Sequence, residues 1–180
     1  MIDAAIELSR DYCAGKIIDG SPALGHAMKV ARKVDEHHPG ASPDLIAAVI
    51  LHDAPYFAPP EIDLDNVLAE LFGPTVAQIV RAIEREHDAL DHEESPTIVL
   101  DHSDVLIASA ADKVVSIGAI LRRAEQHPSP AAFWAARRPF ADRVPYFHAF
   151  MTAAWPHLPN RLALELETVV SAAATAASRP

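Results

Sequence analysis

His52 and Asp53 are adjacent near the end of an apolar run, AVILHDAP, at residues 48–55. Neutral imidazole and carboxylate are both good ligands for first-row divalent cations. Neighbouring side chains on a helix point in different directions, so two polar residues share one apolar surface mainly when something between them holds both. A metal ion is the commonest such group, although most His-Asp pairs are surface or capping residues. The pair becomes a metal site only if other ligands join it.

His26 is a second ligand-type residue on an apolar face. It lies in SPALGHAMKVARKV, where Ser21 and Pro22 are typical of a helix cap and a first helical residue. His26, Val30 and Val34 then share one face of the predicted helix. We therefore expect the imidazole to point inward.

Asp112 is the third indication. It lies within an almost wholly apolar stretch, residues 105–121, where an unpaired carboxylate would cost several kcal/mol or shift its pKa. A cation should face it. Lys113 is the simplest candidate, but adjacent residues on a helix do not face each other. A metal ion or a distant arginine fits better.

The elements that must position these residues are helical almost throughout. Residues 96–100, PTIVL, form the one β-like run, which is too short and isolated to make a sheet. Several prolines stand at or beside helix starts, where proline is least costly. Pro55 disfavours helical geometry at Ala54, so the helix that carries His52 should stop there and turn its negative dipole end toward a cation. The predicted helices cover residues 3–14, 22–37, 43–53, 65–72, 74–87, 103–126, 130–137, 141–155 and 160–177.

The order and spacing of these residues resemble the H...HD...D signature of the HD-domain metal-dependent phosphohydrolases. The separations are similar to those of the RelA/SpoT-type guanosine polyphosphate hydrolases, and the resemblance covers roughly residues 16–167. Further segments match that branch in order: Gly20-Ser21-Pro22, Leu71-Phe72-Gly73 followed by Val76 and Ile79-Val80, Ala111-Asp112-Lys113, and Arg143-Val144 with Tyr146-Phe147.

The resemblance implies a single all-α HD-type helical bundle over residues 1–180. The low-complexity tail at 170–180 is expected to fray. The resemblance also implies that one divalent cation, usually manganese in this branch, is held by His26, His52, Asp53 and Asp112. The implied reaction is metal-assisted hydrolysis, in which the cation lowers the pKa of a coordinated water and screens the phosphate charge. The implied partner is a small phosphorylated molecule or nucleotide.

The chain departs from the family pattern directly after the His-Asp pair. The family places an acidic pair two residues further on, to orient or deprotonate the attacking water. Tyr56 and Phe57 occupy those positions, and neither can act as a carboxylate base. Glu61 or Asp63 could supply a displaced base, although carboxylates in loops are usually only solvated.

A second departure concerns phosphate binding. Ser116 stands where the family has asparagine, and the segment after Val80 runs into an acidic stretch, HDALDHEE, that should repel a polyphosphate. Lys16 and Lys113 match positions where the family has lysine. Lys16, Tyr56, Lys113 and Ser116 are therefore the candidate substrate-binding residues.

His87, His92 and His102 share this acidic segment with several carboxylates. A second metal site there is conceivable because clustered imidazoles and carboxylates suit divalent ions. The spacing is irregular, however, and a solvated loop is the better interpretation.

Composition is that of a compact domain. The chain has 180 residues, half of them hydrophobic, and a single cysteine, Cys13, which excludes an intrachain disulfide. No apolar run approaches the ~20 residues that span a bilayer, and the acidic N-terminus does not resemble a signal peptide. The net charge of −10 argues against nonspecific nucleic-acid binding. The expected compartment is the cytoplasm.

Two functions remain open. The first is hydrolysis of a small phosphorylated metabolite or nucleotide. The second is a non-catalytic relative that keeps the fold and works as a metal or nucleotide sensor or interaction module. Loss of the acidic pair at Tyr56 and Phe57 favours the second, whereas a buried Asp112 favours a retained metal.

Overall fold

The computed structural model describes residues 1–92 and 102–178. Within these ranges the chain is all-α apart from one small hairpin, which confirms the predicted fold class. The β-like run at 96–100 lies outside the described residues. The helices are α1 (Ile2–Tyr12), α2 (Ala23–His37), α3 (Pro43–Leu51), α4 (Ala54–Phe57), α5 (Leu64–Phe72), α6 (Pro74–Asp91), α7 (Ser103–Gln126), α8 (Pro130–Ala135), α9 (Arg138–Asp142), α10 (Val144–Ala154), the 3-10 turn η1 (Trp155–His157) and α11 (Asn160–Ala177).

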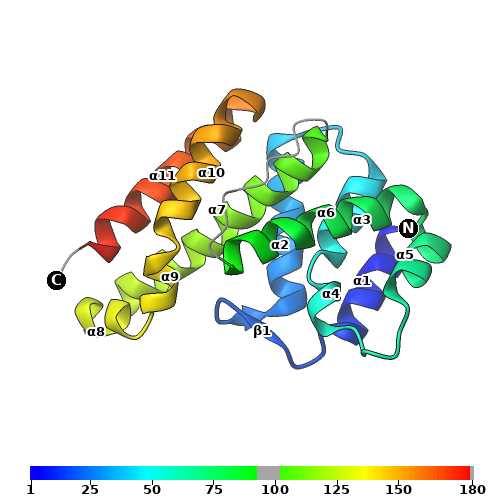
Figure 1. Cartoon of the computed structure of the whole chain (residues 1–180), viewed down its shortest axis with the longest axis horizontal. Coiled ribbons are helices and arrows are strands. Elements are labelled where there is room, and N and C mark those ends of the chain that lie inside the picture. Colours follow the sequence, from blue (N-terminus) through cyan, green and yellow to red (C-terminus); the bar gives the residue numbers. More distant parts are fainter. Residues whose placement is uncertain (93–101, 179–180) are drawn as a thin grey trace.

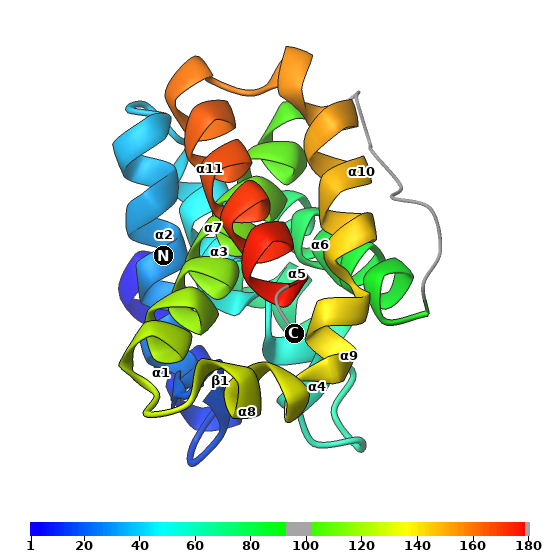
Figure 2. The same cartoon turned by 90° about the vertical axis from the view of Figure 1, so that its left-hand side faces the viewer.

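Helix α7 is the centre of the fold. It packs against α2, α3 and α6 on one side and against α10 and α11 on the other, so it separates the amino-terminal helices from the carboxy-terminal ones (Figure 1). The view along the bundle shows α7 enclosed between α2, α6, α10 and α11 (Figure 2). Its residues from Val105 to Val115 are all buried, and this explains why the stretch is apolar on every face.

Helix α3 is short, and its second half is buried. The Ser42 hydroxyl accepts the backbone N–H of Leu45, and Pro43 occupies the first turn, where its missing N–H costs nothing. Its side chains from Ala47 to Leu51 are buried against α1, α2 and α6. The end of this helix therefore lies in the interior of the protein.

The junction between α3 and α4 differs from the predicted single helix over 43–53. Helix α3 ends at Leu51, and a new short helix begins at Ala54 with Pro55 in its first turn. Proline tolerates that position because no helical hydrogen bond is required from it. His52 and Asp53 thus stand at a bend between two helices, where both side chains are buried.

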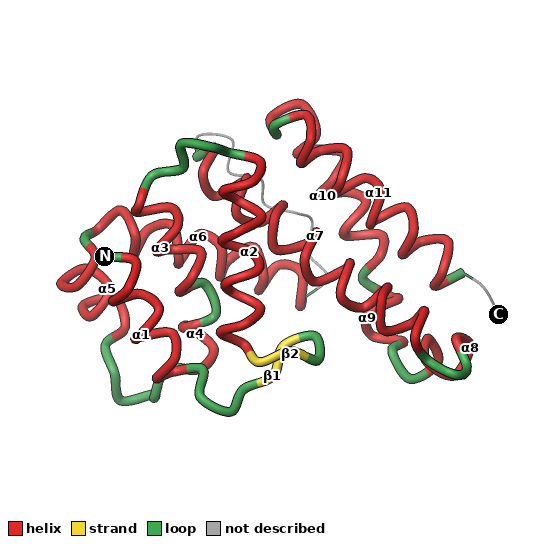
Figure 3. The backbone as a smooth tube through the Cα atoms, turned by 180° about the vertical axis from the view of Figure 1, so that it is seen from behind, coloured by secondary structure: helices red, strands yellow, loops and turns green. Residues whose placement is uncertain are grey.

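A two-stranded antiparallel hairpin precedes α2. Strand β1 (Ile17–Ile18) pairs with β2 (Ser21–Pro22), and the turn residues Asp19 and Gly20 both have positive φ angles, 49° and 78°. This is the conformation that an Asp-Gly turn favours. The prediction that Ser21 caps a helix beginning at Pro22 is wrong, because both residues form β2 and α2 begins at Ala23. Figure 3 shows the hairpin at the amino-terminal end of α2.

The carboxy-terminal elements also differ from the predicted boundaries. The predicted helix over 141–155 is divided between α9 and α10 at Arg143. Helix α11, in contrast, has the predicted bounds of 160–177, and it buries Val170 and Ala173, which lie in the segment expected to fray. Among the described residues, no helix combines the length and the apolar character that crossing a membrane requires.

Candidate metal centre

His26 from α2 and the pair at the α3–α4 bend form a buried His–Asp cluster. His26, His52 and Asp53 each offer a ligand atom, and these atoms lie within 4.8 Å of one another. Asp112 from α7 joins them: its Oδ1 lies 2.9 Å from Nε2 of His26 and 3.8 Å from Nε2 of His52. The fold therefore brings together the four residues that the sequence named as ligands.

Two ligand atoms in the cluster have no hydrogen-bond partner among the described residues. Nδ1 of His52 lies 2.6 Å from the Val49 carbonyl oxygen, so it donates there and leaves Nε2 with a free lone pair. That Nε2 and Oδ2 of Asp53 are both buried and unsatisfied. Buried polar atoms without partners cost about 1–3 kcal/mol each. A divalent cation would satisfy both atoms, so the residues present fit a metal ion.

His87 is a neighbour of the cluster that sequence reasoning missed. Its Nε2 lies 3.1 Å from Oδ2 of Asp112, and its ring centroid lies 5.8 Å from that of His52. The sequence interpretation assigned His87 to a solvated acidic loop, but α6 continues to Asp91 and turns His87 inward. The signal was present: Val76, Val80, Ile83 and His87 follow one helical face.

Asp112 accepts from two imidazoles at once. Burial alone would raise the pKa of Asp112, but the hydrogen bonds from His26 and His87 hold it well below the usual range. Burial likewise favours a lower pKa for each histidine, and the hydrogen bond and negative charge of Asp112 outweigh it, so the pKa of both is raised. The Asp112 carboxylate therefore lies between two imidazoles and favours the protonated form of each.

Tyr56, at the first position of the missing acidic pair, lies over His87. The two rings are stacked with centroids 6.2 Å apart, and the Tyr56 hydroxyl donates to Asp88 and to the Glu84 carbonyl oxygen, both at 3.3 Å. Burial, followed by the negative charge of Asp88, raises the pKa of Tyr56 above its usual range. The phenol stays protonated and fastens α4 to α6.

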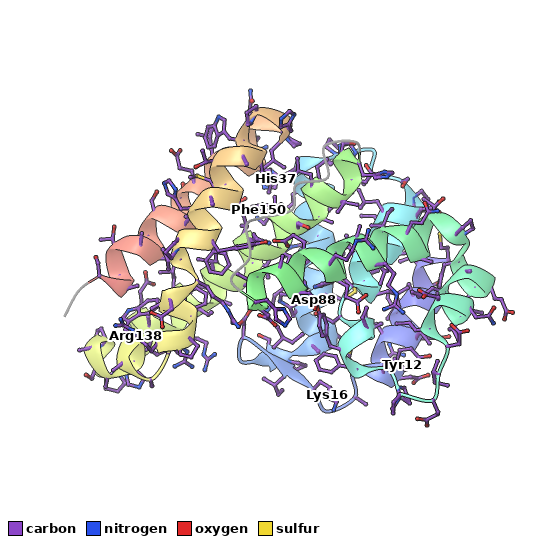
Figure 4. The ribbon with its side chains drawn as sticks, in the orientation of Figure 1. Tyr12, Lys16, His37, Asp88, Arg138 and Phe150 are labelled. Carbon is purple, nitrogen blue, oxygen red and sulfur yellow. The ribbon has the colours of Figure 1, made fainter. Side chains whose placement is uncertain are left out.

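Phe57, at the second position, lies under the ammonium group of Lys16, 5.6 Å from the ring centroid. In Figure 4, Lys16 lies beside the hairpin and below Asp88 of α6. An aromatic pair, with Lys16 beside it, thus occupies the two positions where the sequence resemblance predicts carboxylates.

Lys113 belongs to a buried ion pair beside the cluster. Its side chain is 2% exposed, and the ammonium group donates to Glu86 and lies 4.2 Å from the ring centroid of Phe150, a residue labelled in Figure 4. The Tyr146 hydroxyl donates to the other Glu86 oxygen at 3.0 Å. Lys113 therefore faces Glu86, while Asp112 faces the histidines. Ser116 lies closer to the cluster, with its hydroxyl 3.4 Å from Oδ1 of Asp112.

A cavity of about 300 Å³ opens beside the cluster. It is lined by His26, Asp53, Asp112, His87, Tyr56, Phe57, Lys113, Ser116 and the hairpin residue Asp19, among others. Glu61 and Asp63, the candidate bases, are not among its lining residues, and Asp63 instead caps α5 by accepting the N–H of Asn66. Two larger hollows, of about 610 and 650 Å³, contain none of the cluster residues.

Comparisons with known proteins agree with the fold. No family model matches the sequence, and no curated protein matches it. Among solved structures, the chain is similar to a metazoan orthologue of SpoT that hydrolyses ppGpp and plays a role in starvation responses. The TM-score is 0.64, and the match covers 96% of this chain and 95% of that chain at 16% sequence identity. At this identity the similarity shows the fold, which is an HD-type helical domain.

Proposed function

We propose that this protein is a metal-dependent phosphohydrolase that acts on a small phosphorylated metabolite or nucleotide. The observation that carries the proposal is the pair of buried, unsatisfied atoms, Nε2 of His52 and Oδ2 of Asp53, in a cluster that borders a cavity. A fold similar to that of a ppGpp hydrolase supports the same chemistry.

The residues proposed to hold the ion are His26, His52, Asp53 and Asp112, and manganese is the ion that we expect. Four protein ligands leave open positions on a six-coordinate cation. When bound, the ion supplies Lewis acidity toward a water molecule and a phosphate oxygen.

Asp19 is the carboxylate that we assign as the proton acceptor in place of the missing acidic pair. It lines the cavity from the hairpin turn, and the Ser116 hydroxyl hydrogen-bonds to it. Burial raises the pKa of Asp19 despite that hydrogen bond, and a general base works best when its pKa approaches the ambient pH. Asp91, another carboxylate in the lining, is already paired with Arg143 at 2.9 Å.

The test combines elemental analysis of the purified protein with a screen of phosphate esters and nucleotides in the presence of added manganese. We expect bound metal and release of inorganic phosphate. Asp112→Ala should lose the metal and stay folded, because the buried charge is removed together with its cation. Asp35→Ala, at an exposed position on α2, is the matched control and should keep both metal and turnover.

The occupants of the acidic-pair positions favour a second candidate, a metal-holding sensor without turnover. Tyr56 and Phe57 bear no carboxylate, and Tyr56 is fixed to Asp88. Stoichiometric metal without hydrolysis of any ester would establish this alternative and overturn the hydrolase. Undiminished metal in Asp112→Ala would overturn the ligand assignment itself.

A further inference from the structure

The charges around the cavity are unfavourable for a polyphosphate. Besides the histidines, the charged side chains that line it are four carboxylates and two cations: Asp19, Asp53, Asp91, Asp112, Lys113 and Arg143. Both cations are already neutralised, because Lys113 donates to buried Glu86 and Arg143 lies 2.9 Å from Asp91. A bound divalent cation would offset the charge of one phosphate group, which is about −1.5 to −2 near neutral pH. A second phosphate group would meet carboxylates, and neither cation of the lining is free to neutralise it.

The remaining wall of the cavity is apolar. Apolar and aromatic lining residues come from six elements of the fold: Ile18 of the hairpin, Phe57 of α4, Leu90 of α6, Ile117 of α7, Phe140 of α9 and Phe147 of α10. Phe140 and Phe147 pack together with ring centroids 5.5 Å apart. Such a surface binds an aromatic or apolar group and offers little to a polyhydroxylated one.

The volume of the cavity limits the size of the substrate. Its volume of about 300 Å³ is at the lower end of the range for small-molecule sites. The cavity suits one phosphate group and one ring system better than a nucleotide extended by several phosphates.

From the charges, the apolar wall and the volume of the cavity, we propose that the substrate is a phosphate monoester. It has a single phosphate group and an aromatic or otherwise apolar organic part. This inference rests on the proposed phosphohydrolase function and narrows its substrate class. In the reaction, the oxygen of water forms a bond to phosphorus, and the ester P–O bond breaks with its electron pair on the alcohol oxygen. The water proton ends on that oxygen, giving alcohol and inorganic phosphate.

Two matched substrate pairs test the inference with manganese-supplemented protein. Benzyl phosphate and glycerol phosphate have the same charge and similar alkyl leaving groups, so they compare the organic parts. Guanosine 5′-monophosphate and guanosine 3′,5′-bis(diphosphate) share a nucleoside, so they compare the phosphate charge. We expect kcat/KM to favour the first member of each pair by about tenfold or more, as expected for one aromatic contact or one unscreened charge repulsion.

Substitutions of residues that line the cavity test the physical cause of each expected substrate preference. Phe140→Leu should lower kcat/KM for benzyl phosphate by about two- to twelvefold relative to glycerol phosphate. Phe133→Leu, which alters an aromatic residue outside the cavity lining, is the control and should leave the ratio unchanged. Asp91→Asn removes the ion pair of Arg143, so the free guanidinium can face a second phosphate group. The ratio of kcat/KM between the monophosphate and the bis(diphosphate) should therefore become smaller.

The outcomes separate this inference from the proposed function. Faster hydrolysis of the bis(diphosphate), or equal rates on benzyl and glycerol phosphate, would overturn the substrate class and leave the hydrolase standing. Calorimetric binding in the predicted order without turnover would keep the ligand class and overturn the hydrolase. Neither turnover nor binding of any of the four compounds would overturn both.

Discussion

Nε2 of His87 lies 3.1 Å from Oδ2 of Asp112, on the opposite carboxylate oxygen from the one that His26 contacts at 2.9 Å. Oδ1 therefore faces the His–Asp cluster, and Oδ2 is hydrogen-bonded to His87 of α6. Hydrogen bonds of this kind orient metal-binding carboxylates and leave one oxygen to the ion. His87 is thus a positioning residue for Asp112, held in turn by the stacked ring of Tyr56.

We predict that His87→Leu weakens manganese affinity about 10- to 100-fold, the usual effect of losing such a partner. His87→Gln should recover most of the affinity, because its amide N–H reaches the position of the imidazole Nε2. The measurement is calorimetric titration of manganese, with the electron paramagnetic resonance signal of the bound ion as a second readout.

The control for this pair is His92→Leu, at the exposed end of the same helix, which should bind manganese normally. Wild-type affinity in His87→Leu would show that Asp112 needs no partner on Oδ2. Equal losses in His87→Leu and His87→Gln would instead make His87 a direct ligand.

The same relationship shows what the sequence could and could not predict. His26 and Asp112 were identifiable because each is a polar residue on an otherwise apolar helical face, where burial demands a partner. His87 also lies on such a face, but the acidic residues after it suggested that the helix ended at His87 and that its side chain was solvated. The hairpin was missed because two-residue strands have almost no periodic signal, although Asp19-Gly20 is a turn pair. The partner of Lys113 was not predictable, since Glu86 becomes its neighbour only through packing of α6 on α7.

The acidic-pair positions provide a gain-of-function test. Tyr56→Glu with Phe57→Asp should raise hydrolysis of a phosphate monoester above the level that Asp19 supports, because the pair adds further proton acceptors and general-base assistance contributes up to about 10²- to 10⁴-fold. The Tyr56 hydroxyl contacts Asp88 at 3.3 Å, so Asp88→Asn should be added to remove the repulsion that a new carboxylate would meet there. Phosphate release under saturating manganese gives the rate.

The matched control for this design is Tyr56→Gln with Phe57→Asn in the same Asp88→Asn background. It has the same shape without the carboxylates, and its rate should remain at the level of the unmodified protein. An equal gain from the amides would show that opening the cavity, and not a base, limits turnover. Strong hydrolysis of guanosine polyphosphate by the unmodified protein would refute the premise that the missing pair limits activity.

The buried pair of Lys113 and Glu86 should matter greatly to stability when one partner is removed alone. Lys113→Met leaves the Glu86 carboxylate buried without its cation and should lower the free energy of unfolding by about 3–5 kcal/mol. Glu86→Gln in the same chain removes the orphaned charge and keeps an acceptor for Tyr146, so the double variant should recover most of the loss. Urea unfolding followed by circular dichroism measures both. A double variant no more stable than Lys113→Met would contradict this account.

Glu165 on α11 provides a pH-dependent test far from the cavity. Its carboxylate accepts from Lys33 at 2.9 Å and from His37 at 2.7 Å, both on α2. Burial would raise the pKa of Glu165, but these hydrogen bonds outweigh it and lower the pKa below the usual range. An acid with a lowered folded-state pKa adds stability above its unfolded pKa of ~4.3, and that contribution is lost as the pH falls through the folded value.

Glu165→Gln should therefore have a lower Tm than the unmodified protein at pH 7. The difference in Tm should disappear as the pH falls below the unfolded pKa and through the folded one. Glu167→Gln, an exposed change on the same helix, should show no such gap at either pH. Thermal melts followed by circular dichroism across this range decide the matter, and a gap that persists unchanged in acid would mean that the carboxylate's charge does not stabilise the contact between α2 and α11.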